Sequence, residues 1–143
     1  MKILKLRQNI LLPKDTKTRN NDEFDEAIES IMRVRKSWES SKKEQRHELV
    51  ETYFRSLKKL VELSRKQGCK SCIEKNLVCG FRSFSKLKHC RGENNSLRLI
   101  SANCFHHFFK ELKSFYQEEG KLYEHQMLLK EYKNNRQNLM AIN

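Results

Sequence analysis

The chain has 143 residues, the length of one domain and enough to bury a hydrophobic core without disulfides or metal ions. One proline and four glycines are too few for the many tight turns of a β-sandwich or barrel, and the apolar residues recur at helical spacing, so we expect an all-α bundle of four to five helices. The net charge of +12 favours anionic partners, and without an apolar run of about 20 residues we expect no transmembrane segment.

Residues 1–20 are predicted to form a basic N-terminal segment and loop of a single helical domain that spans residues 1–143. In this segment Lys2, Lys5 and Arg7 interrupt the apolar residues that precede Pro13. A secretory signal peptide has an uninterrupted apolar stretch followed by small residues at a cleavage site, and this segment has neither. We therefore expect an intracellular protein of the nucleus or cytoplasm, or a secreted one if Met1 was added to a mature chain.

The first long helix is predicted to begin after Asn21, a favourable N-cap residue, and to close its apolar face with Trp38. Ser41 and Glu44 have the spacing of a capping box, so a second helix is expected to begin there. This helix carries one long apolar stripe, with basic side chains mostly off the stripe, and Gly68 is its predicted C-terminal stop.

Four of the five cysteines lie in the stretch 67–92, QGCKSCIEKNLVCGFRSFSKLKHCRG, which is predicted to connect the central helix to the last long helix. Three interpretations stay open. A CxxC turn places two thiolates on one zinc ion, which would then be the cofactor. The candidate ligands are Cys69, Cys72, Cys79 and Cys90. Alternatively, the five cysteines supply two disulfides in an oxidising compartment. In the third interpretation they are buried thiols, which fits Cys104 best.

The last long helix is predicted to begin after Ser96, a plausible N-cap, and to carry a wide apolar stripe from Leu97 to Tyr116. Gly120 interrupts this pattern, and a looser apolar pattern continues to Tyr132. Residues 134–143 are expected to be a frayed tail. Sequence motifs of nucleotide-binding loops, metalloproteases, serine hydrolases and calcium-binding loops are missing, so we expect a protein without catalytic activity.

Positive charge is concentrated between residues 32 and 98. We predict that residues 42–98 bind nucleic acid or a nucleoprotein complex, with lysine and arginine side chains contacting phosphates. The predicted contact residues are Lys42, Lys43, Arg46, Arg55, Lys58, Lys59, Lys70, Lys75, Arg82, Lys86, Lys88 and Arg91. Phe81 and Phe84 lie among the later basic residues, where exposed rings would stack on unpaired bases. We expect instead that both rings close the end of the bundle.

Residues 35–60, RKSWESSKKEQRHELVETYFRSLKKL, resemble the tryptophan-to-tyrosine-phenylalanine helix region of interferon-gamma-like helical cytokines through Trp38, Tyr53 and Phe54. The resemblance implies a secreted receptor ligand with disulfides and a precursor signal peptide. Such a ligand could be a homodimer. A second alternative is a protein–protein interaction scaffold whose charge matches an acidic protein surface. The scaffold interpretation predicts reduced cysteines and no zinc.

Overall fold

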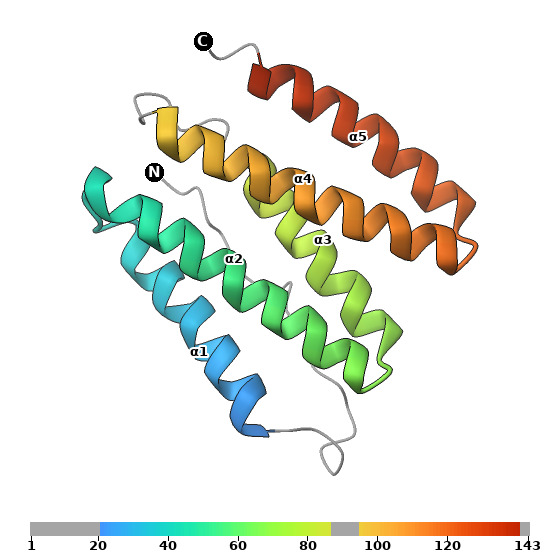
Figure 1. Cartoon of the computed structure of the whole chain (residues 1–143), viewed down its shortest axis with the longest axis horizontal. Coiled ribbons are helices and arrows are strands. Elements are labelled where there is room, and N and C mark those ends of the chain that lie inside the picture. Colours follow the sequence, from blue (N-terminus) through green and yellow to red (C-terminus); the bar gives the residue numbers. More distant parts are fainter. Residues whose placement is uncertain (1–20, 87–94, 141–143) are drawn as a thin grey trace.

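The computed structural model describes residues 21–86 and 95–140, and within these ranges it contains five α-helices and no strand. The helices are α1 (Asn21–Trp38), α2 (Lys43–Lys66), α3 (Lys70–Lys86), α4 (Asn95–Glu118) and α5 (Leu122–Met140). The prediction of an all-α bundle of four to five helices is confirmed (Figure 1). No described helix combines the length and the apolar character that a membrane span requires. The predicted segment 1–20 lies outside the described residues, and α5 continues into the segment for which a frayed tail was expected.

Short turns join α1 to α2, α2 to α3 and α4 to α5, so these consecutive helices run antiparallel (Figure 1). Gly68 and Gly120 both have φ of +68°, a left-handed conformation that glycine adopts without strain. After α2, Cys69 N–H donates to the Ser64 carbonyl and Gly68 N–H to the Arg65 carbonyl, the two bonds of a Schellman cap. The same pair of bonds ends α4 at Gly120. The predicted stop at Gly68 is therefore confirmed.

The start of α2 differs by one residue from the predicted capping box. Lys42 N–H donates to Gln45 Oε1 at 3.0 Å, so Gln45, and not Glu44, reaches back to the first turn. Ser41 Oγ instead donates to the Trp38 carbonyl at 2.6 Å and so caps the end of α1. The N-cap residue of α2 is therefore Lys42, one position after the predicted one.

The stretch predicted as a connection is itself mostly helical, because α3 occupies residues 70–86 of it. Figure 1 shows α3 behind α2 and α4, and it packs on both of them. Gly80 permits this close approach, since a Cβ there would lie 2.7 Å from the ring of Phe108 on α4. The most deeply buried large side chains are Trp38, Tyr53, Phe24, Phe81, Phe84, Phe105 and Phe108. The expected burial of Trp38, Phe81 and Phe84 is therefore confirmed.

Candidate functional site

The basic residues at the start of α2 lie beside the α1–α2 turn. Lys42 and Lys43 are exposed. The Arg46 guanidinium lies 5.3 Å from the centroid of the Trp38 ring, and its Nε donates to Ser41 Oγ at 3.3 Å. A phosphate would have to compete with these contacts for Arg46, so this residue has a packing role at the turn.

The next group, Arg55, Lys58 and Lys59, follows the outer side of α2. Lys59 Nζ lies 3.4 Å from Glu23 Oε1 on α1. Arg55 and Lys58 are exposed, and no acidic side chain of the described residues lies within ion-pair distance of either. Lys58 Nζ is placed 5.2 Å from the centroid of the Phe54 ring. Two charges of this group are thus available to an anionic partner.

On α3, Lys75 and Arg82 are exposed and seven residues apart, which places them on one face about 10 Å apart along the helix axis. Within the described part of the chain neither side chain makes an ion pair. Lys70 differs, because its Nζ lies 3.0 Å from Glu119 Oε1 at the end of α4. The side chain of Lys86 is not described, and Lys88 and Arg91 lie outside the described residues.

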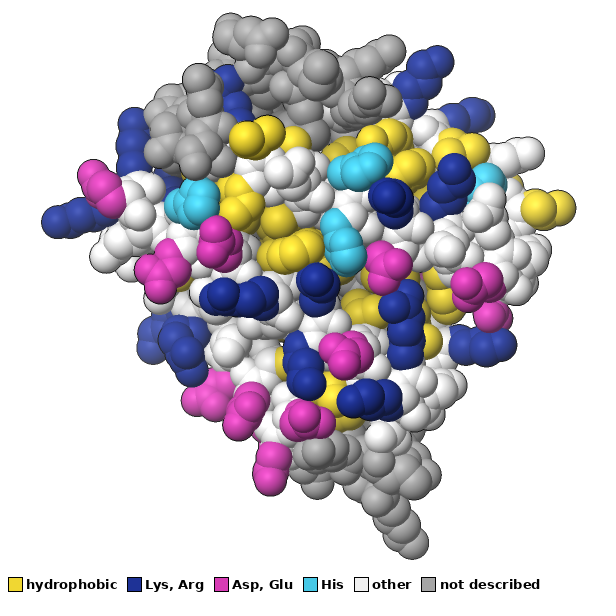
Figure 2. Space-filling view, viewed as in Figure 1, with side chains coloured by type: hydrophobic (Ala, Val, Ile, Leu, Met, Phe, Trp, Pro, Cys, Tyr) yellow, Lys and Arg dark blue, Asp and Glu magenta, His cyan; other side chains and the backbone are white. Residues whose placement is uncertain are grey.

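The predicted contact residues that the structure describes lie in different parts of the surface. Lys58 lines a small cleft between α2 and α4, whereas Arg82 lines a groove among α3, α4 and α5 that also contains Glu124 and Glu131. Figure 2 shows the face formed by α1, α2, α4 and α5, where basic and acidic side chains are interspersed. The outer side of α3 lies away from this view, since α3 is behind α2 and α4 (Figure 1).

The cleft between α2 and α4 has a volume of about 170 Å³, which is below the range of sites for drug-sized ligands. Arg65 Nη1 at its edge lies 3.1 Å from Glu111 Oε1. The His107 ring packs edge-on against Phe54, and burial lowers the pKa of His107. Glu62 and Glu111 also line this cleft, so Lys58 is its one lysine or arginine without an ion pair to a described residue.

The described cysteines have three different environments. Cys69 and Cys72 are joined by a disulfide. Cys79 is buried and its Sγ lies 3.5 Å from Tyr53 Oη. Cys104 is a buried thiol, as expected, and burial raises its pKa to about 12.

The disulfide occupies two of the four predicted zinc ligands in this oxidation state, and Cys90 lies outside the described residues. No cluster of three potential metal ligands occurs among the residues that are described. The zinc site thus stays a prediction.

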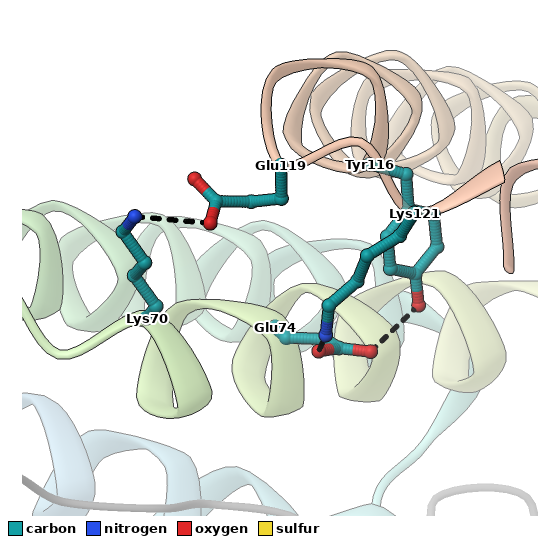
Figure 3. Close-up of polar contacts among 5 residues, drawn as sticks. All are labelled: Lys70, Glu74, Tyr116, Glu119 and Lys121. Carbon is teal, nitrogen blue, oxygen red and sulfur yellow. Dashed lines mark hydrogen bonds and ion pairs between the residues drawn. The ribbon is translucent and has the colours of Figure 1, made fainter.

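Sequence reasoning missed a set of polar contacts that joins the start of α3 to the α4–α5 turn (Figure 3). Glu74 accepts hydrogen bonds from Lys121 Nζ at 2.7 Å and from Tyr116 Oη at 3.0 Å, while Lys70 pairs with Glu119. The hydrogen bond to Glu74 raises the pKa of Lys121. Lys70 and Glu74 have i,i+4 spacing, which in isolation predicts that they pair with each other. We call this set of five residues the α3 clamp.

No protein-family model, curated protein or solved structure matches this chain. The candidates for a functional role are therefore chosen from the contacts and exposure of the side chains. These are the exposed basic residues without ion pairs on α2 and α3, and the disulfide-bonded pair Cys69 and Cys72.

Proposed function

We propose that this protein binds nucleic acid without catalysis, through phosphate contacts made by the outer face of α3. The observation that carries the proposal is the exposure of Lys75 and Arg82 on one face of that helix, where neither forms an ion pair with a described residue. The net charge of +12 supports the same partner class, since it attracts polyanions over a distance.

The surroundings favour α3 over α2 as the main contact. Glu74 is the one acidic residue in the α3 sequence, and the α3 clamp engages its carboxylate. On α2, Glu51 precedes Arg55 by four residues and Glu62 follows Lys58 by four, so acidic side chains flank both free charges. A phosphate near α2 meets acidic side chains of that helix, whereas one near Arg82 meets Glu124 and Glu131 of α5, which line the same groove. The preference for α3 therefore rests on Lys75 and on the single acidic residue of α3, which is already engaged.

The burial of Phe81 and Phe84 limits how such an interface could recognise bases. Phe81 and Phe84 are each at most 1% exposed, so neither presents a face on which a base stacks. Contacts from lysine and arginine to phosphates carry no sequence information directly. We therefore expect binding that depends little on base sequence and falls steeply with salt.

The test is fluorescence anisotropy of labelled DNA and RNA duplexes titrated with the full chain over a series of salt concentrations. Each phosphate contact contributes about 0.9 to the slope of log affinity against log salt, so Lys75→Gln/Arg82→Gln should reduce the slope by about 1.8. The control, Lys59→Gln/Lys70→Gln, removes the same charge at two sites that form ion pairs, one on α2 and one on α3. It should reduce the slope by less than half as much.

The variant Arg55→Gln/Lys58→Gln compares α2 with α3. Its loss of slope is expected to lie between the losses of the other two variants. An equal loss in all three variants would show that only total charge matters and would refute a contact surface on α3. Absence of binding by the unmodified chain at the lowest salt would refute nucleic-acid binding itself.

The secreted receptor ligand is a second candidate, and the disulfide between Cys69 and Cys72 favours it, because structural disulfides persist in oxidising compartments. It predicts that the pair stays oxidised when the folded protein is exposed to a cytosolic thiol buffer. Intact mass after alkylation measures this directly. Complete reduction of the folded protein in that buffer would argue against the secreted candidate.

A further inference from the structure

The disulfide occupies the first turn of α3, immediately after the α2–α3 turn. Gly68 reverses the chain, and Ile73 N–H donates to the Cys69 carbonyl at 3.0 Å, so Cys69 is the N-cap residue. Cys72 lies three positions later, within the first helical turn. A CxxC pair in this position has one sulfur at the helix end and one on the helix body.

The two sulfurs differ in access. Cys69 is partly exposed, whereas Cys72 is 1% exposed and packed with the core. A dissolved thiol therefore reaches the Cys69 sulfur and not the Cys72 sulfur. We infer that Cys69 and Cys72 form a thiol–disulfide exchange site for small thiols and disulfides, in which Cys69 is the exchanging sulfur and Cys72 the resolving one. This inference is independent of nucleic-acid binding.

The local electrostatics favour a thiolate at Cys69 in the reduced protein. The first-turn N–H groups of a helix have no intrahelical acceptor, and together they place partial positive charge at the N-cap. Lys70 follows Cys69 directly, but its charge is paired with Glu119, so the helix end supplies the positive charge at Cys69. Glu74, the acidic residue that would oppose a thiolate, is held by Lys121 and Tyr116. Cationic surroundings of this kind make a cysteine reactive.

An incoming thiol reduces the disulfide in two steps. Its thiolate attacks Cys69 Sγ, a mixed disulfide forms at Cys69, and Cys72 leaves as a thiolate that takes up a proton. A second thiolate attacks the incoming group's sulfur in that mixed disulfide, and Cys69 leaves as a thiolate. The sum is one protein disulfide and two thiols giving one protein dithiol and one small disulfide, with two electrons passing to the protein.

The α3 clamp fixes the helix that carries the pair. Lys70 and Glu74 each reach across to the α4–α5 turn, so the start of α3 is tied to a second element by contacts that do not involve sulfur (Figure 3). Reduction of the disulfide leaves those contacts in place. The two thiols are therefore expected to stay close enough to reoxidise with each other.

The probe is glutathione, and the readout is intact mass with peptide mapping of the full chain. Reduced Cys72→Ser, mixed with glutathione disulfide, should form a mixed disulfide on Cys69. Reduced Cys69→Ser should form one on Cys72 at least about tenfold more slowly, because that sulfur is buried and is farther from the helix end. Cys104→Ser is the control, and it should not alter exchange at the pair. Far-UV circular dichroism verifies that each variant is folded.

The unmodified chain gives a second test that does not depend on any variant. Across a series of glutathione buffers, the folded protein should interconvert between dithiol and disulfide, and the reduced fraction should depend on the square of the thiol concentration. Equal adduct rates on Cys69 and Cys72 would overturn the assignment of roles. Reduction that occurs only in denaturant would overturn the exchange site and identify the disulfide as structural.

Discussion

Helices α4 and α5 are neighbours joined by one tight turn, yet they are attached to the bundle in different ways. On α4, Phe105, Phe108 and Leu112 are buried. Phe108 stacks on Phe84 of α3 and packs edge-on against Phe54 of α2, and Phe105 stacks on Phe81 of α3. On α5, Leu128 is the one apolar side chain that is buried in the described residues. Figure 1 shows α5 at the edge of the bundle, beside α4.

A few specific contacts replace core burial on α5. The Tyr132 ring stacks on Phe109 with a centroid separation of 3.6 Å, and Tyr132 Oη lies 2.8 Å from His106 Nδ1. At the other end of the helix, Lys121 is held by the α3 clamp. The exposed apolar residues Leu122, Tyr123 and Met127 remain on its surface. The buried core therefore lies mainly in α1–α4, whereas α5 is attached by local contacts.

The largest expected effect tests the α4 side of this comparison. Phe108 is fully buried and stacks on Phe84 with a centroid separation of 5.8 Å. Phe108→Ala should lower the free energy of unfolding by about 3–5 kcal/mol, because it removes a ring and leaves a cavity. Urea unfolding followed by Trp38 fluorescence measures the change. The control Tyr123→Ala, at a position 71% exposed, should change it by no more than about 0.5 kcal/mol.

The second prediction concerns the local unfolding of α5. Tyr132→Ala removes the ring stacked on Phe109 and the hydrogen bond to His106, and it should lower the local opening free energy of α5 by about 2 kcal/mol. Hydrogen exchange should accelerate across α5 and remain unchanged in α1–α4. Faster exchange in all five helices would contradict the distinction between the two attachments.

Local sequence signals predicted the helices and their stops better than the contacts between them. The left-handed cap at Gly68 and the burial of Trp38 follow from turn chemistry and helical periodicity. The stretch 67–92 is predicted as a connection, but residues 70–86 of it form α3, in which Ile73, Leu77 and Phe84 are buried. Tertiary packing against α2 and α4 makes this stretch a helix.

The candidate site was less predictable for a related reason. A sequence shows that Lys59, Lys70 and Lys75 are charged, but not which of them meets an acid on another helix. Pairs such as Lys59 with Glu23 join distant residues, and no local rule finds them. The relative placement of the basic residues on α2 and α3 depends in the same way on tertiary packing, because α3 lies behind α2 and α4 (Figure 1).

The close approach of α3 to α4 gives a third prediction, smaller than the first two. Gly80→Ala places a methyl group against the Phe108 ring, at an initial separation of 2.7 Å. Overpacking costs about 1–3 kcal/mol, and the better helix propensity of alanine returns up to about 1 kcal/mol. A net loss of about 1–2 kcal/mol is expected in urea unfolding. The control is Ser114→Ala, at an exposed position of α4. If Gly80→Ala stabilised the protein, α3 and α4 would be able to move apart at little cost, which would contradict the prediction.

The two adjacent histidines of α4 supply the smallest prediction, because they face different neighbours. His106 contacts Tyr132 of α5, whereas His107 packs edge-on against Phe54 of α2, with ring centroids 5.1 Å apart. Burial lowers the pKa of His107, and the positive charges of Lys58, Arg65 and Lys110 act in the same direction against the opposing effect of Glu111. The folded protein thus takes up this proton less readily than the unfolded chain, whose histidines titrate near pH 6.5.

As the pH falls through about 6.5, the unfolded state therefore binds more protons than the folded state, and the free energy of unfolding decreases until the folded His107 is itself protonated. His107→Gln should flatten this part of the stability profile, measured by urea unfolding at a series of pH values. His106→Gln is the matched variant on the same helix, and it weakens the attachment of α5 through the lost contact with Tyr132. The opposite result, a profile flattened by His106→Gln but not by His107→Gln, would contradict this prediction. It would place the acid-sensitive contact between α4 and α5 instead of between α2 and α4.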